Sequence, residues 1–360
     1  MKTFFLRWTA FAMIMVAAAV SYSPVALAQT APTSLDPALL YQNCNTDGGL
    51  LGLSGGDEAK TKYPIVLVSG LAGAAPNFLV PGVKYWYQIP EELCRKGATV
   101  YVASMPAVND NYVRGEELLR QVKLLLATLK VDKVNLIGHS MGGWSVRYVA
   151  ATFPEGVASV TTIASPHKGS EFGAFFLNNG PVVLLLGETA FNLIGELDNM
   201  ADGTTYPVSA NAAIHQISPA GMAAFNAAFP SAGISTAPCA GVDEDTGTRG
   251  EIDKRTGTDG GHYVQRLYSW TGNAPAPFGS IDTASNALML TTSLMMLNQG
   301  AGKNDGLAGV CSSRFGKVIG TYGWNHFNEI NQLFGLVPLF EANPLTVIVN
   351  HANRLKLAGL

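Results

Sequence analysis

The sequence predicts an α/β fold with a doubly wound, mostly parallel β-sheet and a helical cap. Three observations support this prediction. Strand-like and helix-like segments alternate from Tyr63 onwards, an order typical of parallel sheets with helices on both faces. A Gly-x-Ser-x-Gly pentapeptide, Gly138 to Gly142, stands between one such strand and a helix. The chain of 360 residues is also long enough for one large α/β domain.

The N-terminal residues have the pattern of a secretory signal peptide. Lys2 and Arg7 precede an apolar run over residues 10–20, and Ala26-Leu27-Ala28 provides a small-x-small cleavage pattern. A membrane anchor is the alternative, but the run is short and is followed by the cleavage pattern. No other stretch is long and apolar enough to span a bilayer, so we expect an exported, soluble mature chain. The predicted organisation is a signal peptide (1–28), an N-terminal extension (29–60) and a main domain (61–360) with a cap at about 170–230.

Composition excludes some functions and suggests others. Hydrophobic residues make up 48% and charged residues 14% of the chain, and roughly 25% charged is usual in soluble proteins. We therefore expect extra apolar surface. The net charge of −3 and the lack of a basic patch interleaved with aromatic residues argue against nucleic-acid binding.

The four cysteines are expected to pair in an exported chain. None of them has the two-residue spacing of a zinc or redox site, so structural disulfides are favoured. Sequence alone allows three connectivities among Cys44, Cys94, Cys239 and Cys311.

The first half of the main domain contains four predicted strands. Tyr63–Val68 and Ala98–Ala103 are short apolar runs typical of buried parallel strands. Residues 115–129 carry apolar side chains at helical spacing, which places one stripe against the sheet. Val134–Ile137 and Val157–Ile163 are the next strands.

The middle of the chain interrupts this alternation. From Ser170 to about Pro230 the sequence predicts short apolar helices with few charges. They can be an ordinary part of the core, but an apolar insertion after the strand of the pentapeptide also suits a lid over an apolar site. Downstream, residues 243–261 mix charges with Gly and Thr and predict a solvated surface loop.

Ser140 is the predicted nucleophile of this chain. A serine at the tip of a sharp turn between strand and helix has an accessible Oγ, and the flanking glycines leave room for the strained backbone. The following helix also directs its free N–H groups and positive dipole end to the same place. The pentapeptide alone is weak evidence, since small-residue turns that contain serine are common.

A nucleophilic serine needs a base and an acid, and in this fold class they follow it in the order acid, then histidine. That order favours Asp305 and His326, each on a Gly-flanked loop, with the strand-like Lys317–Gly320 between them. His351 is the rival base, in a helix-like tail expected at the surface. His139 is expected to pack beside the turn. The remaining histidines come before the acid: His167, His215 and His262.

Together these segments resemble the secreted true lipases of the Pseudomonas and Burkholderia type. The resemblance runs from about Thr61 to Leu360. It rests on Tyr63 to Gly73, Arg114-Gly115-Glu116, Val134 to Gly143, Ser165 to Ser170, Tyr268-Ser269-Trp270, Asn304-Asp305-Gly306, Cys311-Ser312-Ser313, Asn325 to Gly335 and His351 to Lys356.

The resemblance implies an α/β-hydrolase fold with a mobile lid and a triad of Ser140, Asp305 and His326. It also implies a Cys239–Cys311 disulfide, which leaves the state of Cys44 and Cys94 open. The implied oxyanion donors are the backbone N–H groups of Leu71 and Met141. Arg114 would brace the oxyanion loop through ion pairs, or be a solvated charge at a helix start. The chain departs from the family at Ser69, where His is usual, and at Met141, where Gln or His is common.

One structural calcium ion is also implied, at Asp282, Asn328 and the carbonyls of Gln332 and Leu336. The family has Asp at the position of Asn328. An amide oxygen can ligate calcium but brings no charge, so the implied site is weak or empty. No organic cofactor is implied.

We therefore predict a secreted serine hydrolase of water-insoluble carboxylic esters, most simply a triacylglycerol lipase. An aliphatic polyester depolymerase or a short-chain esterase would use the same triad. A catalytically idle lipid-binding relative is disfavoured by the intact triad. A lipase-specific foldase is a further partner that the resemblance raises.

Overall fold

The structure is a computed structural model that describes residues 56–73, 77–78 and 80–360. The predicted signal peptide, residues 29–55 of the predicted extension and Cys44 lie outside the described residues. The predicted domain boundaries therefore stay predictions.

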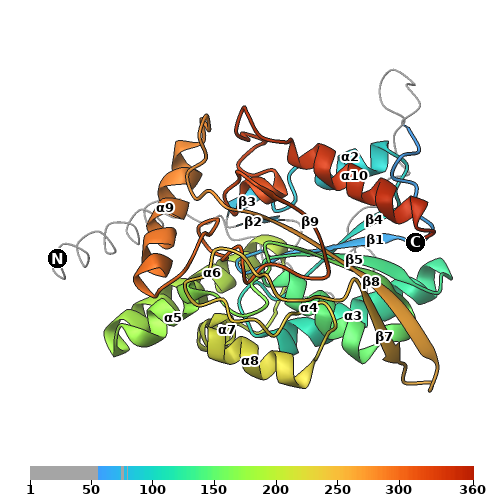
Figure 1. The fold of residues 1–360 in the computed structure, drawn as a ribbon, viewed down its shortest axis with the longest axis horizontal. Coiled ribbons are helices and arrows are strands. Elements are labelled where there is room, and N and C mark those ends of the chain that lie inside the picture. The colour runs from blue at the N-terminus through green and yellow to red at the C-terminus, as the bar shows by residue number, and fades with distance from the viewer. Residues whose placement is uncertain (1–55, 74–76, 79) are drawn as a thin grey trace. The chain divides into compact units, whose positions relative to one another are not determined.

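A seven-stranded sheet forms the core of the described part (Figure 1). The strand order is β4-β1-β5-β6-β8-β7. The remaining strand, β9, pairs with β8, which also pairs with β7. All pairs are parallel except β7 with β8. The strands are β1 (Ile65–Val68), β4 (Val100–Ala103), β5 (Val134–His139), β6 (Val157–Ile163), β7 (Ile252–Thr256), β8 (His262–Gly272) and β9 (Lys317–Tyr322). A separate antiparallel hairpin consists of β2 (Asn77–Phe78) and β3 (Val80–Lys84).

Helices cover both faces of the sheet, as the doubly wound prediction requires (Figure 1). In β1, Ile65 and Leu67 pack towards α2 (Ile89–Arg95) and α10 (Pro344–Leu357). Val66 and Val68 pack on the opposite face against α3 (Asn111–Leu129) and α4 (Gly142–Thr152). A strand buried on both faces has no polar alternation, which explains its continuous apolar sequence.

The predicted strands and helices of the first half are confirmed, with small shifts at their ends. The charged segment 243–261 is not a loop throughout, because β7 spans Ile252–Thr256 and pairs with β8. That prediction was wrong for a physical reason: β7 is an edge strand with an exposed face, so its sequence, Ile-Asp-Lys-Arg-Thr, is polar.

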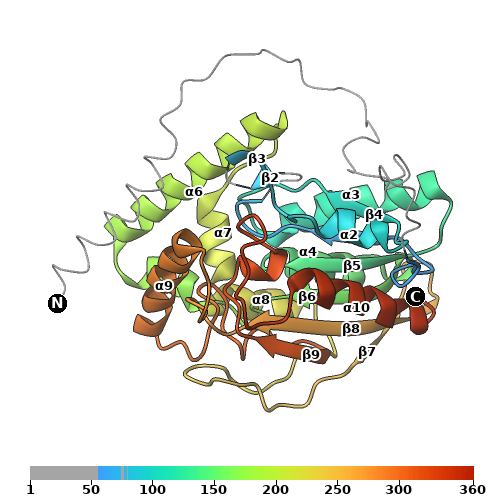
Figure 2. The same cartoon turned by 90° about the horizontal axis from the view of Figure 1, so that it is seen from above.

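The cap consists of four helices inserted between β6 and β7, and Figure 2 shows them at one end of the sheet. They are α5 (Glu171–Asn178), α6 (Pro181–Asp202), α7 (Ala210–Ile217) and α8 (Pro219–Ala228). The helical character was predicted correctly, but α6 is 22 residues long rather than short. Another helix, α9 (Thr283–Asn298), stands between β8 and β9 and packs against α5. In the part of the chain that the structure describes, no helix combines the length and apolar character needed to cross a bilayer.

Candidate active site

Ser140 lies in a sharp turn between β5 and α4, and we call residues 138–142 the Ser140 turn. Its φ of 54° is a left-handed conformation that a non-glycine residue adopts at a cost. The glycines on either side have no room for a side chain. A Cβ on Gly138 would lie 2.4 Å from the backbone of Gly142, and one on Gly142 would lie 2.2 Å from the Val68 carbonyl oxygen. The motif therefore encodes the strained turn that its sequence predicts.

Asp305 and His326 form a buried hydrogen-bonded pair. The Nδ1 atom of His326 lies 2.8 Å from Asp305 Oδ2, and the backbone N–H of His326 donates to the Asp305 carbonyl at 3.0 Å. The other oxygen, Asp305 Oδ1, accepts from the N–H groups of Leu307 (2.8 Å) and Ala308 (2.7 Å). A carboxylate on Nδ1 fixes the imidazole tautomer and leaves Nε2 as the basic nitrogen.

The third contact expected of a triad is not formed. Within the described residues, the Ser140 hydroxyl makes no hydrogen bond, to His326 or to any other group. The two residues belong to adjoining parts of the site, because the ring of His139, next to Ser140, lies 4.5 Å from the His326 ring, centroid to centroid. Such hydrogen bonds are often long before substrate binds. The structure thus joins two of the three predicted residues directly.

The turn after β1 approaches Ser140 from the other side. A Cβ on Gly70 would lie 2.7 Å from the Ser140 Cβ, so this glycine allows close contact. Among the described residues, neither the Leu71 N–H nor the Met141 N–H donates a hydrogen bond. Both expected oxyanion donors are therefore available to a ligand.

Arg114 fixes the direction of the Leu71 N–H. Its Nη2 donates to the Gly70 carbonyl at 3.1 Å and also to the Ser69 carbonyl. The C=O and N–H of a trans peptide point in opposite directions, so holding the Gly70 oxygen turns the Leu71 N–H away from Arg114. The side chain is fully buried, which rules out a solvated charge. It braces the loop through hydrogen bonds to backbone carbonyls, whereas ion pairs were expected. Burial lowers its pKa to about 10, and the group remains charged at neutral pH.

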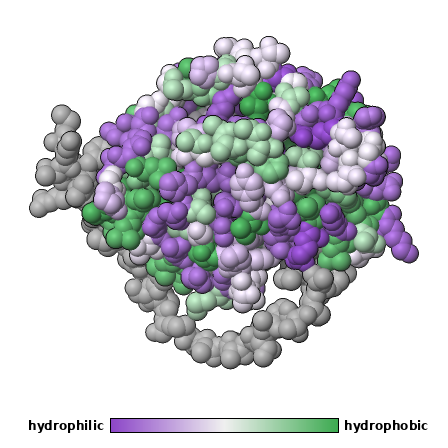
Figure 3. All heavy atoms as spheres, turned by 90° about the horizontal axis from the view of Figure 1, so that it is seen from below, coloured by the Kyte–Doolittle hydropathy of each residue, from purple (hydrophilic) through white to green (hydrophobic). Residues whose placement is uncertain are grey.

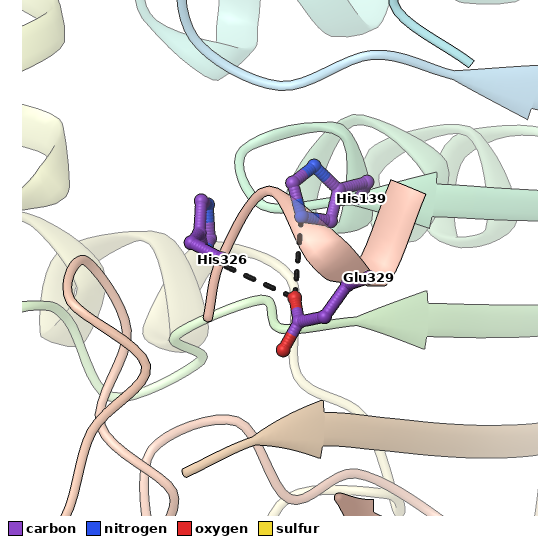
Figure 4. Close-up of side chains that lie close together, drawn as sticks. All are labelled: His139, His326 and Glu329. Atoms are coloured by element: carbon purple, nitrogen blue, oxygen red, sulfur yellow. Dashed lines mark hydrogen bonds and ion pairs between the residues drawn. The ribbon is translucent and has the colours of Figure 1, made fainter. Parts of the chain in front are cut away.

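A second carboxylate, Glu329, stands beside the two histidines and was not predicted (Figure 4). Its Oε2 lies 3.3 Å from His139 Nε2 and 3.9 Å from His326 Nδ1, and its Oε1 accepts from the Gly272 N–H. His139 is more than a packing residue, because its Nδ1 pairs with the Tyr85 hydroxyl at 2.6 Å. The Tyr85 hydroxyl in turn accepts from the Gly70 N–H at 2.8 Å.

Burial shifts the pKa values of His139 and Glu329 towards their neutral forms. It lowers the pKa of His139 well below its usual value and raises the pKa of Glu329 well above its own, the latter also because Asp305 lies nearby. Two imidazoles and a carboxylate could in principle ligate a transition metal. However, His326 Nδ1 already faces Asp305, and the raised pKa of Glu329 disfavours the ionised form that a metal ion would need. We therefore treat the cluster as hydrogen-bonded support of the site.

The residues expected to hold calcium do not fit a cation. Leu333 N–H donates to Asp282 Oδ2 at 3.2 Å, and Asn328 Nδ2 donates to the Gln332 carbonyl at 3.2 Å. Leu336 lies further along the chain, with its N–H donating to the Leu333 carbonyl. Calcium needs oxygen atoms that are free to face it. Here N–H donors point at two of the proposed ligands.

The rival base, His351, lies inside the protein rather than at the surface. It is fully buried on α10, and its Nε2 lies 2.8 Å from Thr161 Oγ1. Burial lowers its pKa to about 3. The tail helix was predicted correctly, but its position was wrong because its apolar side covers the sheet.

The disulfide implied by the resemblance is confirmed. Cys239 and Cys311 are bonded, with their Cα atoms 5.6 Å apart, which is ordinary disulfide geometry. Cys94 is also disulfide-bonded. Five residues separate Cys311 from Asp305, so this bond closes a loop next to the predicted acid.

The cap and α9 expose apolar side chains. On α6 the exposed fractions of Val182, Leu185 and Met200 are 68%, 61% and 70%. On α9, which has no charged residue, Leu290, Leu294 and Leu297 are half exposed. Apolar side chains gather on the face in Figure 3 towards the end where α5 and α9 lie in Figure 1. This surface agrees with the low charge content and suits contact with an insoluble substrate.

Comparisons with known proteins agree with this fold. A family described as the alpha/beta hydrolase fold matches residues 63–201. A triacylglycerol lipase of Pseudarthrobacter phenanthrenivorans is 41% identical over 319 residues, or 84% of this chain and 99% of that protein. A triacylglycerol lipase of Burkholderia plantarii is 41% identical over 319 residues, or 84% and 88% of the two chains. The crystal structure of a metagenomic carboxyl esterase matches with a TM-score of 0.52 at 14% identity, over 96% and 90% of the two chains. The last likeness concerns the fold alone.

Proposed function

We propose a mechanism and a substrate class for this chain. It belongs to the family of bacterial triacylglycerol lipases and is a carboxylic ester hydrolase of the α/β-hydrolase fold. The observation that carries the mechanism is the buried bond between His326 and Asp305. The strained Ser140 turn adjoins this pair through His139, and its hydroxyl makes no hydrogen bond to any described residue. This arrangement supports acyl transfer through a nucleophilic serine.

In the proposed first half-reaction, His326 Nε2 removes the proton of Ser140 as its Oγ attacks the ester carbonyl. The carbonyl oxygen becomes an oxyanion and accepts from the N–H groups of Leu71 and Met141. In the measured serine-enzyme case one such donor contributes about 2.7–4 kcal/mol to transition-state stabilisation. His326 then gives the proton to the leaving alcohol, and an ester of Ser140 remains.

In the second half-reaction, His326 removes a proton from water as the water oxygen attacks the acyl-enzyme. His326 then gives this proton to Ser140 Oγ as the bond between Oγ and the acyl carbon breaks, which releases the acid and restores the free serine. Asp305 holds His326 in the correct tautomer and stabilises the imidazolium that forms in each step. The raised pKa of Glu329 favours Asp305 as the carboxylate bonded to the imidazole. Arg114 acts through the Gly70–Leu71 peptide and is a positioning residue.

The substrate we propose is a water-insoluble ester, with triacylglycerol first, as in the named activity of the relatives. The exposed apolar side chains of α6 and α9 support an insoluble substrate over a small soluble ester. An aliphatic polyester has the same chemistry and the same apolar character, so it is the second candidate. Secretion after removal of residues 1–28, and assistance by a foldase, are further parts of the proposal.

The experiment is a substrate panel with the purified protein. Emulsified triolein, a polyester film and soluble p-nitrophenyl butyrate are hydrolysed side by side, with Ser140→Ala as the blank. We expect the highest rate per enzyme on triolein, and a rate that increases once the substrate exceeds its solubility. If p-nitrophenyl butyrate alone is cleaved, the protein is a short-chain esterase. Binding of triolein without hydrolysis of any ester would support the idle relative.

A further inference from the structure

Four buried carboxamide side chains hold the loop that carries His326, residues 323–336, which we call the His326 loop. Each of the four is at most 2% exposed. Carboxamides are neutral and offer both donors and an acceptor, so they can join backbone groups inside a protein without a buried charge. We name this set the carboxamide clamp: Asn325, Asn328, Asn331 and Gln332.

Three members of the clamp join the His326 loop to distant elements. Asn325 Nδ2 donates to Asn286 Oδ1 on α9 at 3.1 Å. Asn331 Nδ2 donates to the Tyr87 carbonyl at 3.0 Å, and Gln332 Nε2 donates to the Lys84 carbonyl at the end of β3. The loop is thereby tied on one side to α9 and on the other to the segment between β3 and α2.

The fourth member, Asn328, closes the loop on itself. Its Oδ1 accepts from the Asn325 N–H at 3.1 Å. Only the amide oxygen can accept this hydrogen bond, so the bond fixes the orientation of the carboxamide. The Nδ2 therefore faces the Gln332 carbonyl, at 3.2 Å. The Gln332 carbonyl oxygen is one of the expected calcium ligands. Here it accepts a hydrogen bond from Asn328 Nδ2, which stands where the cation would be.

Asp282 is engaged in the same way. It caps α9, with Oδ1 accepting from the Ser285 N–H at 3.0 Å and Oδ2 accepting from the Ser285 hydroxyl. Oδ2 also accepts from the Leu333 N–H at 3.2 Å, which ties α9 directly to the His326 loop. Asp282, the only carboxylate among the four expected ligands, thus accepts hydrogen bonds from three donors. The second position where a carboxylate was expected is occupied by the neutral Asn328.

We propose that the His326 loop of this chain is held without calcium, because the carboxamide clamp and the Asp282–Leu333 bond make the connections that a metal ion would make. Asn328 is the central residue. Its Nδ2 donates a hydrogen bond to the oxygen that a cation would otherwise share with a carboxylate at this position. The proposal concerns how the loop is stabilised, so it can fail while the proposed hydrolase function holds.

The test measures the melting temperature of the mature protein and two variants, in EDTA and in millimolar calcium chloride. The wild-type protein should melt at the same temperature in both. Asn328→Asp should melt lower in EDTA, because a carboxylate cannot donate to Gln332 O and repels Asp282. Calcium should raise its melting temperature by several degrees, since two carboxylates then face the ion.

Asn331→Asp is the matched control. It also places a carboxylate in the clamp and breaks the bond to the Tyr87 carbonyl, but its position is not one of the expected ligands. Its melting temperature should fall equally in EDTA and in calcium. Magnesium in place of calcium should not restore Asn328→Asp, since magnesium demands a stricter octahedral geometry.

A wild-type melting temperature that rises with calcium and falls with EDTA would overturn the proposal. If Asn328→Asp does not fold in EDTA, calorimetric titration of calcium into the wild-type protein decides instead. No heat of specific binding is expected, and saturable binding of one ion per chain would show that the native loop holds calcium.

Discussion

The Ser140 turn and the His326 loop are built in opposite ways. The sequence signal for the turn lies within five consecutive residues, in which Gly138 has no space for a Cβ beside Gly142 and Gly142 has none beside Val68 of β1. The His326 loop owes its shape to partners far away in the sequence, such as Tyr87, which lies 244 residues from Asn331. A local steric constraint leaves a recognisable motif, whereas a set of long-range hydrogen bonds leaves single Asn and Gln residues with no evident pattern.

The largest effect is expected for Ser140→Ala, which removes the nucleophile from the turn. Turnover of p-nitrophenyl butyrate should fall on the order of 10⁶-fold, the loss measured in another serine hydrolase. The fold should remain, because the removed hydroxyl makes no hydrogen bond in the described structure. Initial rates and a circular dichroism spectrum check both points. Undiminished turnover in a folded variant would contradict the role of the turn.

The next largest effect is expected for Asp305→Asn, on the side of the His326 loop. The amide can donate to His326 Nδ1 and stabilise the wrong tautomer, which lowered kcat by about 10⁴-fold in a measured triad. Adding Ser140→Ala should reduce the rate little further, because residues that act as a unit are not additive. A rate close to that of the wild type for Asp305→Asn would show that another carboxylate, with Glu329 as the nearest, orients His326.

A glycine substitution separates the two kinds of structure by stability. Gly142→Ala places a Cβ 2.2 Å from the Val68 carbonyl oxygen, so β1 and α4 must move apart, at a cost of about 1–3 kcal/mol or more. Gly309→Ala is the control in the loop of Asp305, because its Cβ would meet atoms only at 3.9 Å and beyond. Urea unfolding should show the loss for Gly142→Ala alone. Equal losses would mean that the Ser140 turn is no tighter than the Asp305 loop.

The smallest effect on catalysis is expected at His351, a buried histidine whose ring nitrogens face Thr161 and Arg354 rather than a carboxylate. Its pKa is lowered from 6.5 to about 3 in the folded state. The unfolded state therefore binds the extra proton between these values, and stability contributed by the neutral histidine is lost as the pH falls from 6.5 towards 3.

His351→Gln should remove this part of the pH dependence and keep most of the activity at pH 8. Unfolding free energies from urea titrations between pH 4 and pH 8 provide the measurement. A slope identical to that of the wild-type protein would show that His351 does not titrate in this way, and a large loss of activity would revive it as the base.

The difference between the two regions also explains what the sequence could predict. The parallel strands, the Ser140 turn and the Asp305–His326 pair leave local signals, namely apolar runs, flanking glycines and a fixed order along the chain. The one sequence signal for Glu329 is its position three residues after His326, in Asn-Glu-Ile. No neighbouring residue in the sequence indicates that Gly272 and His139 contact its carboxylate. The edge strand β7 was missed because its exposed face makes it resemble a loop.

The most direct test of the central claim is covalent labelling with a p-nitrophenyl alkylphosphonate, followed by mass spectrometry of the peptides. Our account predicts one phosphonyl group per chain, on Ser140, with loss of all esterase activity. It also predicts that Ser140→Ala and Asp305→Asn are labelled slowly or not at all. A phosphonyl group on a different residue, or full inactivation of a Ser140→Ala protein that still turns over substrate, would contradict the assignment of Ser140 as the nucleophile.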